Sequence, residues 1–387
     1  MRILFCNHEY PPLGGGGGAF NALLAKELAK RHQVSVLTSR TNGLPAEERQ
    51  DGVRIVRAPI FCPRDQMAAG LMPLAGYMIG ATSLGLRHMA GNGYDVINTH
   101  FCLPAGPVGQ RLARAARIPN VLTVHGGDLF DPSKKTSPHR HELLRRWNRS
   151  LLRHASAVVA QSTDTIRNVH WFYDSDLPVE RIPLGIEPPP EAVGQRATYG
   201  VGADETLFVT VGRLVARKAV DRLIRIFANL DAPEARLLII GTGPEEDPLR
   251  AQIASLGLAE RVRLLGHVST HEKFRLLRMA DCFLSASQHE GFGLMFVEAM
   301  ASGLPVIAYD QGGQVDFLSD GTTGHLVPLN DEARFLDAIR HLLRSKDLRQ
   351  RIGRDNRVRA RQFGIERSAM RYEALFEATR SSMAKAA

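Results

Sequence analysis

The chain has 387 residues, a net charge of +9 and a sequence pI near 9.6. At about 150 residues per domain this length predicts two to three domains, and 44% of the residues are hydrophobic, enough for an ample core. The positive charge is not gathered in a tail, and no zinc-finger, RNP or long basic-helix pattern is present, so we expect no nucleic-acid partner. The charge fits either arginine-rich helix surfaces or attraction to an anionic lipid or phosphorylated substrate.

The cysteines and the N-terminus favour the cytoplasm. The four cysteines form no CxxC pair, and Cys6 and Cys282 lie in or beside apolar runs, where a reduced cysteine acts as a small hydrophobe. The first apolar run ends at Asn7, too early for the apolar region of a signal peptide. We therefore expect a cytoplasmic protein.

Short apolar runs typical of buried strands alternate with helical stretches along the chain. They lie at residues 3–6, 34–37, 96–99, 121–124, 158–160, 207–211, 237–240, 262–265, 283–285 and 306–309. Such runs indicate parallel strands that are covered by helices on both faces. The sequence therefore predicts an α/β protein with two doubly wound domains.

The composition also suggests where these domains begin and end. Residues 185–202 are rich in proline and poor in apolar periodicity, as expected of a linker. We expect an N-terminal domain over residues 1–186, a linker over 187–205, a second domain over 206–366 and a C-terminal helix over 367–387. A cleft between two such domains, at the carboxyl ends of the strands, is the expected ligand site.

Two carboxylates eight residues apart, Glu290 and Glu298, flank a glycine-rich turn. The turn joins a strand at residues 282–286 to a predicted helix at residues 294–301, which Gly303 should end. Backbone N–H groups at the start of such a helix point at whatever binds there. Amides that bind anions between two acceptor side chains suit a ligand that is part phosphate and part polyol, such as a nucleotide-sugar.

Two cations follow the predicted strand at residues 207–211. Gly212 and Arg213 end this strand, and Lys218 comes five residues after Arg213. Neither cation has an obvious acidic partner nearby in the sequence, which suits a diphosphate, since arginine offers a planar fork and lysine a mobile point charge. The alternative is a pair of surface cations.

The first domain carries two further candidates at strand ends. Five glycines, Gly14–Gly18, separate the first strand from a helix expected over residues 19–30, so their amides can approach a phosphate closely. A flexible loop is the alternative. His125 and Asp128, in the sequence HGGD, follow the strand at residues 121–124. We expect hydrogen bonds to substrate hydroxyls there, because no serine or cysteine elbow motif accompanies them.

Three other segments leave their function open. Residues 66–86 contain no charged residue, so a buried or pocket-lining helix pair, a membrane-contacting element and a membrane span are all compatible with them. Residues 141–155 predict a helix with a core face that includes Trp147 and an arginine face, with membrane docking as the alternative. Asp174 and Asp176 resemble a metal-binding DxD pair, but they lie in a predicted loop, so we expect no metal site.

Four motifs occur in the order PPLGGGGG, HGGD, GRLVARK and EGFGLMFVEAMASGLPVIA. Together they resemble glycosyltransferase family 4, whose members are retaining sugar transferases with the GT-B fold, and the similarity spans Tyr10 to about Val327. The resemblance implies two Rossmann-like domains. It also implies that the C-terminal domain holds the nucleotide-sugar donor, and that the last helix returns to the N-terminal domain.

The resemblance further implies roles for individual residues of the second domain. Arg213 and Lys218 would neutralise the donor diphosphate, Glu290 would contact the hydroxyls of the donor sugar, and Glu298 would bind the ribose hydroxyls. Backbone groups of the turn would contact sugar and phosphate, namely those of Gly291, Phe292, Gly293 and Leu294. Ala219 stands where the family usually has glycine, a change that should be tolerated if its φ stays negative. Residues 312–316 depart from the family pattern GGxPE.

In the first domain the resemblance places His125 near the 6-position of the sugar. It places the glycine loop, Gly15, Gly16 and Gly17, near the phosphates and the acceptor.

We therefore expect a hexosyltransferase that moves a sugar from a nucleotide diphosphate, a UDP- or GDP-sugar, to an acceptor hydroxyl with retention and without a metal or cofactor. The expected acceptor is a glycan or a lipid-linked molecule, with peripheral contact to the inner face of the cytoplasmic membrane. The alternatives are a GT-B sugar-nucleotide epimerase or phosphorylase, or a non-catalytic nucleotide-sugar-binding protein.

Overall fold

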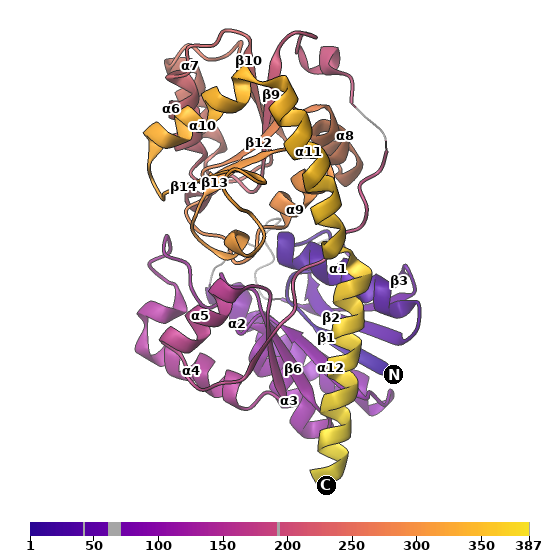
Figure 1. Ribbon diagram of the computed structural model, residues 1–387. Helices are drawn as coiled ribbons and strands as arrows, with labels where there is room; N and C mark the ends of the chain where they lie inside the picture. The colour runs from indigo at the N-terminus through magenta and orange to yellow at the C-terminus, as the bar shows by residue number, and fades with distance from the viewer. Residues whose placement is uncertain (42, 61–70, 192–193, 387) are drawn as a thin grey trace. The chain divides into compact units, whose positions relative to one another are not determined.

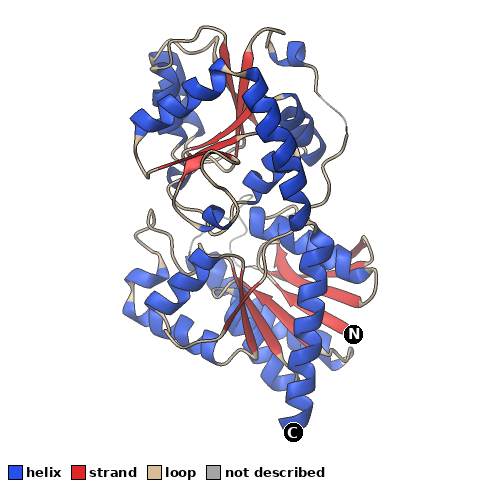
Figure 2. Cartoon of the chain, in the orientation of Figure 1, coloured by secondary structure: helices blue, strands red, loops and turns tan. Residues whose placement is uncertain are grey.

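A computed structural model of the protein describes residues 1–41, 43–60, 71–191 and 194–386 (Figure 1). The chain forms two compact units, one made of Met1–Ile186 together with Ile365–Ala387 and the other of Glu187–Gly364. Each unit is a largely parallel sheet between helices (Figure 2). The predicted α/β class with two doubly wound, Rossmann-like sheets is therefore confirmed.

The first unit contains an eight-stranded sheet in the order β3-β4-β2-β1-β5-β6-β7-β8, in which only the β3–β4 pair is antiparallel. Its strands are β1 (Arg2–Cys6), β2 (Gln33–Arg40), β3 (Glu47–Gln50), β4 (Val53–Pro59), β5 (Val96–His100), β6 (Asn120–Val124), β7 (Ala157–Ala160) and β8 (Val179–Arg181). Its longer helices are α1 (Gly16–Ala29), α2 (Leu71–Ala90), α3 (Ala105–Ala116), α4 (Glu142–Arg153), α5 (Thr163–Phe172) and α12 (Ile365–Ala386), and α12 packs against α1.

The second unit contains a six-stranded parallel sheet in the order β11-β10-β9-β12-β13-β14. Its strands are β9 (Thr206–Val211), β10 (Ala235–Ile240), β11 (Val262–Gly266), β12 (Cys282–Ser285), β13 (Val306–Tyr309) and β14 (Gly324–Val327). Its longer helices are α6 (Val220–Ala228), α7 (Glu246–Ser255), α8 (Thr270–Met279), α9 (Leu294–Ala301), α10 (Glu332–Arg344) and α11 (Lys346–Ala360).

The strand order reverses at one place in each sheet. In the first unit the chain leaves β1 toward β2 and later returns to the other side of β1 as β5. In the second unit it leaves β9 toward β10 and returns as β12. Loops that leave neighbouring strands in opposite directions open a crevice at the carboxyl ends of those strands, and ligands of open α/β sheets bind in such crevices.

Part of the predicted linker is packed on the second unit. The guanidinium of Arg196 donates to the carbonyl of Met279 and pairs with Asp281 at 2.8 Å. The second unit ends at Gly364, and α12 begins at Ile365, two residues before the predicted start of the last helix. These contacts depend on residues far apart in the sequence, which local composition does not reveal.

Two of the three segments whose function the sequence left open, residues 66–86 and 141–155, differ in their packing. Residues 66–70 lie outside the described part of the chain, and the rest of the uncharged segment belongs to α2, where Tyr77 and Ala81 are buried against the sheet. In α4, Leu151 is buried, but Trp147 is 41% exposed, so the predicted place of Trp147 on the core face is wrong. None of the described helices combines the length and apolar character that a membrane crossing needs.

Candidate functional site

The switch point of the second sheet brings together most of the residues that the sequence singled out. β12 pairs with β9 in parallel, so the loops that follow the two strands leave from the same edge of the sheet. A small pocket lies at this edge. It is lined by Gly212, Arg213 and Lys218 after β9, by Ser285 and Ser287 at the end of β12, and by neighbouring residues Thr210, Val211, Leu214, Val220, Ile239 and Ile240.

Glu290 is held between two cations that follow β9. The Lys218 Nζ lies 2.5 Å from Oε1 of Glu290, and the Arg217 Nη1 lies 3.0 Å from Oε2. Arg217 Nη1 also donates to the carbonyl of His289. The expectation that Lys218 lacks an acidic partner is therefore wrong, because the fold brings it beside a carboxylate 72 residues away. Sequence reasoning missed Arg217, since nothing in the local pattern separates it from the cations around it.

This arrangement keeps Glu290 ionised. Burial alone would raise the pKa of its carboxyl, but the charges of Lys218 and Arg217 outweigh burial and lower the pKa to about 2. Burial lowers the pKa of the Lys218 ammonium, and Glu290 opposes that change. Glu290 is consequently a fixed hydrogen-bond acceptor near neutral pH and has no proton to donate.

Two glycines hold the backbone of Glu290. The Gly313 N–H donates to the Glu290 carbonyl at 2.7 Å, and Gly312 forms a β-bridge with Glu290. Gly312 has a φ of +113°, and a Cβ there would lie 2.5 Å from the same carbonyl oxygen. The loop that departs from the family pattern therefore contacts Glu290 through its glycines.

Arg213 differs from the two cations that bind Glu290. Its side chain is exposed at the pocket and makes no hydrogen bond or ion pair with any described residue. Its positive charge contributes to the lowered pKa of Lys218, after the effect of burial. Arg213 is thus the lining cation whose fork of N–H donors stays available for an anion.

The turn after Lys218 adopts an unusual backbone conformation. Ala219 has a φ of +45°, so the condition under which alanine should be tolerated here, a negative φ, is not met. A left-handed residue other than glycine costs about 1–2 kcal/mol. The turn brings the Lys218 side chain over Gly212, where a Cβ would lie 3.2 Å from the Lys218 Cε. The glycine therefore leaves room for the lysine that reaches Glu290.

The helix α9 begins at Leu294 as predicted. Gly293 precedes it with a φ of +87°, and a Cβ there would lie 2.4 Å from the Phe296 ring. The ring of Phe292 is buried, with centroid distances of 5.0 Å to Phe317 and 5.9 Å to Phe363, so only its backbone can face a ligand. The first turn of a helix leaves N–H groups that favour an anion.

Glu298 lies on α9, and it does not take part in the contacts of Glu290 with Lys218 and Arg217. Its Oε1 accepts from the Nζ of Lys273 on α8 at 2.5 Å, and both side chains are partly exposed. Lys273 was not recognised from the sequence, because its partner lies on the next helix along the chain.

In the first unit, the helix α1 begins at Gly16 instead of Ala19. Gly16 and Gly17 therefore belong to its first turn, and Gly15 precedes it. The Gly15 N–H donates to the carboxylate of Glu9 at 3.1 Å, so an acidic side chain lies where a phosphate was expected. Gly17 allows close packing, since a Cβ there would lie 2.6 Å from the Phe101 ring.

Asp128 joins the loops that follow β5 and β6. Its carboxylate accepts from the backbone N–H of His125 at 2.9 Å and from that of Cys102 at 2.7 Å. Burial raises the pKa of Asp128 to about 6, against the opposing effect of these hydrogen bonds. Each carboxylate oxygen accepts one backbone N–H, so Asp128 holds the two loops together, and its contact with a sugar stays a prediction.

His125 lies within an aromatic cluster at the end of β6. Its ring centroid is 4.4 Å from that of Phe101 and 6.5 Å from that of Phe20. Burial, with a smaller contribution from His8, lowers the pKa of His125 to about 3. The imidazole is therefore neutral at physiological pH and suits hydrogen bonding.

The structure groups the predicted residues into two clusters. One, in the second unit, contains Gly212, Arg213, Lys218, Glu290 and the turn that leads into α9. The other, in the first unit, contains the glycine loop, His125 and Asp128. Asp174 pairs with Arg153 at 2.5 Å. No group of three His, Cys, Asp or Glu side chains in the described ranges is arranged to hold a metal ion.

Sequence comparisons match both units to glycosyltransferases. Residues 195–359 match the family described as glycosyl transferases group 1, and residues 15–185 match the glycosyl transferase 4-like domain. The D-inositol 3-phosphate glycosyltransferase of Nocardia farcinica is 30% identical over 361 residues, which cover 88% of this chain and 79% of that protein. The GDP-mannose-dependent alpha-(1-6)-phosphatidylinositol monomannoside mannosyltransferase of Mycolicibacterium smegmatis is 28% identical, with coverage of 88% and 89%.

A solved structure shares the fold. The crystal structure of Anabaena HepE in complex with UDP and glucose superposes with a TM-score of 0.79 at 21% identity, covering 98% of this chain and all of that one. The chain belongs to the group 1 glycosyltransferases of the family 4 type and has the GT-B fold.

The ion pair between Lys218 and Glu290 should contribute strongly to the stability of the fold. We expect Lys218→Met to lower the free energy of unfolding by about 3 kcal/mol at pH 7, because it leaves a buried carboxylate short of one partner. The pKa of Glu290 is depressed from 4.5 to about 2 in the folded protein, so its contribution is complete above pH 4.5 and is lost toward pH 2. The difference in free energy of unfolding between the variant and the wild type, measured by urea titration, should therefore decrease as the pH falls from 4.5 toward 2.

Arg213→Met is the matched control for this measurement. It removes an exposed cation of the same pocket and should change the free energy of unfolding by less than about 0.5 kcal/mol. Equal losses in the two variants would contradict a structural role that is specific to the Lys218–Glu290 pair.

Proposed function

We propose that this protein transfers a hexosyl group from a nucleotide diphosphate to an acceptor hydroxyl, with retention of the anomeric configuration and without a metal ion. The observation that carries this proposal is the pocket at the β9–β12 switch point. There Arg213, which pairs with none of the described residues, lines the same pocket as Gly212 and Lys218, and Lys218 pairs with Glu290. An anion with a polyol attached fits such a set of groups.

The second unit supplies the groups for the donor. Arg213, Lys218 and the first N–H groups of α9 bind the diphosphate, where negative charge grows as the bond to the anomeric carbon breaks. Glu290, kept ionised by its two cations, accepts hydrogen bonds from the sugar hydroxyls. Glu298 binds the ribose. His125 of the first unit donates a hydrogen bond to the substrate, near the 6-position of the sugar.

The chemistry needs no protein nucleophile. Both oxygens of Glu290 are engaged by cations, which leaves the carboxylate poorly suited to attack the anomeric carbon. In the proposed step the bond from the anomeric carbon to the diphosphate oxygen breaks, and a bond to the acceptor oxygen forms on the same face. The acceptor proton passes to the departing phosphate oxygen. Catalysis then consists of positioning and of stabilising the charge on the leaving group.

We propose a UDP- or GDP-sugar as the donor and a glycan or lipid-linked acceptor on the cytoplasmic side of the membrane. Support comes from the names of two similar proteins, one a GDP-mannose-dependent enzyme that acts on a phosphatidylinositol monomannoside and the other a complex with UDP and glucose.

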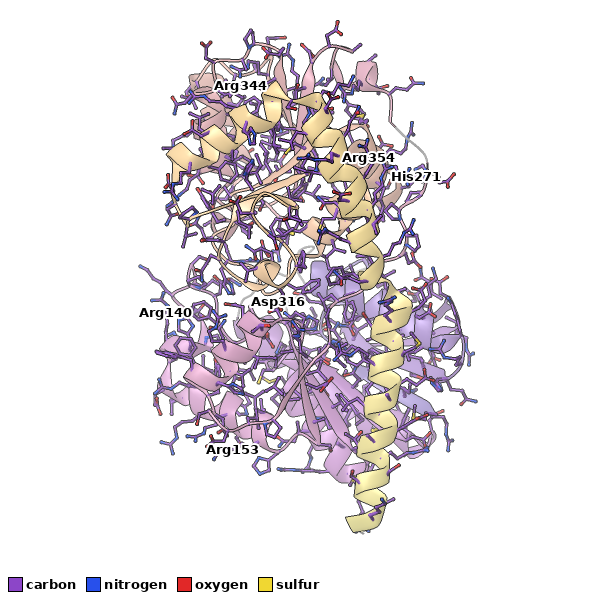
Figure 3. The ribbon with its side chains drawn as sticks, viewed as in Figure 1. Arg140, Arg153, His271, Asp316, Arg344 and Arg354 are labelled. Carbon is purple, nitrogen blue, oxygen red and sulfur yellow. The ribbon has the colours of Figure 1, made fainter. Side chains whose placement is uncertain are left out.

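The surface of α4 supports contact with an anionic membrane. The helix buries Asn148, Leu151 and Leu152 and exposes Leu143 and Trp147, of which Leu143 is 82% exposed. The basic residues of α4 and of the adjoining η1 turn (Pro138–Arg140) are Arg140, Arg145, Arg146, Arg149 and Arg153, and Figure 3 shows Arg140 and Arg153 on one edge of the first unit. Exposed Leu and Trp among basic side chains suit a helix that lies in the headgroup region.

Loss of Arg213 should impair catalysis without unfolding the protein. We expect Arg213→Met to lower turnover with the correct donor about 100- to 1,000-fold, the usual cost of one preorganised group that stabilises developing charge. The donor is found first by thermal shift with UDP-, GDP-, ADP- and dTDP-sugars. Arg354→Met, on the exposed face of α11 (Figure 3), is the matched control and should keep full activity. Full turnover in Arg213→Met would refute the assignment.

Metal independence has its own test. We expect full turnover in excess EDTA, because the proposed charge stabilisation comes from side chains and backbone N–H groups. Activity that disappears with the chelator and returns with Mg²⁺ or Mn²⁺ would show that a metal takes part. Anomer analysis of the product by NMR tests retention, and inverted product would contradict the proposed step.

The membrane contact is tested by co-sedimentation with vesicles. The protein should bind vesicles that contain anionic phospholipid and should not bind vesicles of phosphatidylcholine alone. Each basic residue near the surface is worth about 1 kcal/mol, so Arg146→Glu with Arg149→Glu should weaken binding by at least roughly 30-fold. The control, Arg351→Glu with Arg354→Glu on α11, makes the same change of charge in the second unit. Equal loss in both double variants would indicate a general charge effect and not a surface on α4.

A further inference from the structure

A chain of buried polar groups connects α12 to His125 within the first unit. The Tyr372 hydroxyl lies 3.2 Å from Oγ1 of Thr123, which in turn lies 3.2 Å from Oδ1 of Asn98. The Asn98 Nδ2 lies 2.8 Å from Nε2 of His100, and Nδ1 of His100 lies 3.0 Å from Nε2 of His125. Tyr372, Thr123, Asn98 and His100 are fully buried.

The chemistry of these groups gives the chain a direction. The Thr123 hydroxyl donates to Asn98, so the amide of Asn98 turns its N–H toward His100. Nε2 of His100 must then accept, which puts the proton of this neutral ring on Nδ1. That proton is donated to Nε2 of His125, and the His125 proton therefore lies on Nδ1.

Aromatic rings surround the two histidines. The His100 ring stacks on Phe5, with a centroid distance of 5.5 Å and an interplanar angle of 11°. Phe20 and Phe101 contact His125 from other sides. Polar groups buried among aromatic rings cannot form hydrogen bonds to solvent. The loss of one hydrogen bond in the chain would therefore leave a buried donor or acceptor unsatisfied.

His125 Nδ1 makes no hydrogen bond with any described residue. It is the one end of the chain that can reach a ligand, because Nε2 is already occupied by His100. We propose that Asn98 and His100 are positioning residues that hold His125 in the neutral tautomer with its proton on Nδ1, and that this Nδ1–H is the group presented to the substrate. The last part rests on the proposed function, whereas the tautomer does not.

The tautomer can be measured directly on the full-length protein. Two-bond ¹H–¹⁵N correlation spectra of the ¹⁵N-histidine-labelled protein distinguish the two neutral tautomers, and His125→Gln assigns the His125 signals. We expect a protonated Nδ1 and an unprotonated Nε2 for His125. The opposite pattern, with the proton on Nε2, would overturn the inference even if the protein proved to be an active transferase.

Variants of the chain then link the tautomer to turnover. His100→Phe keeps an aromatic ring between Phe5 and Phe20 but removes the donor, so the His125 signals should become those of a mixture of tautomers. The loss of one oriented hydrogen bond should lower kcat/KM roughly 3- to 10-fold. His100→Asn, which restores an N–H near the place of Nδ1, should recover the single tautomer.

Tyr372→Phe is the matched control from the same buried chain. It removes one hydroxyl at the far end, while Thr123 can still donate to Asn98, so the tautomer and kcat/KM should stay unchanged. A single Nδ1–H tautomer in His100→Phe would show that the chain does not set it. A changed tautomer in His100→Phe with unchanged kcat/KM would confirm that the chain sets the tautomer and would overturn the proposed contact of Nδ1–H with the substrate.

Discussion

The site of the second unit depends on one buried interaction, the pairing of Glu290 with Lys218 and Arg217. The cations belong to the turn after β9 and the carboxylate to the loop after β12, so the pair fixes two loops that leave the switch point of the sheet. Separating them would leave charges buried without a partner, which is far more costly than losing an exposed ion pair. The glycines at positions 212 and 312 serve this interaction, since each makes room for one of its participants.

Much of the fold could be predicted because buried strands are short and apolar, and the runs read from the sequence correspond to most of the observed strands. Four observed strands, β3, β4, β8 and β14, were not predicted, and β4 was missed because arginines interrupt its apolar residues. β3 (EERQ) is a polar, exposed edge strand that carries no apolar signal. α1 begins within the glycine run, although glycine is a poor helix former, and the Phe101 ring packs closely on Gly17 in its first turn. Trp147 has the spacing of a core residue but lies on the surface.

The candidate site could be predicted in its parts but not in its pairings. Arg213, Lys218 and Glu290 are recognisable because each lies at a strand end within a motif. The contacts between them could not be predicted, since a salt bridge between residues 72 positions apart depends on which strands lie side by side in the sheet. Lys273 and Glu298 lie on different helices, 25 residues apart, and the Glu9–Gly15 hydrogen bond depends on the conformation of the glycine loop. The network behind His125 was missed because its members, Asn98 and Thr123, look like ordinary residues of buried strands.

The packing of Phe292 has a consequence for how the second unit can respond to a ligand. Its ring sits between Phe317, just after the η4 turn (Gly313–Asp316), and Phe363, which comes one residue before the chain leaves this unit. The turn that leads into α9 is thus joined by aromatic contacts to the crossing point of the polypeptide. A small displacement of that turn cannot remain local, because close-packed rings transmit strain instead of absorbing it. The segment where the chain leaves this unit should therefore move together with the turn that precedes α9.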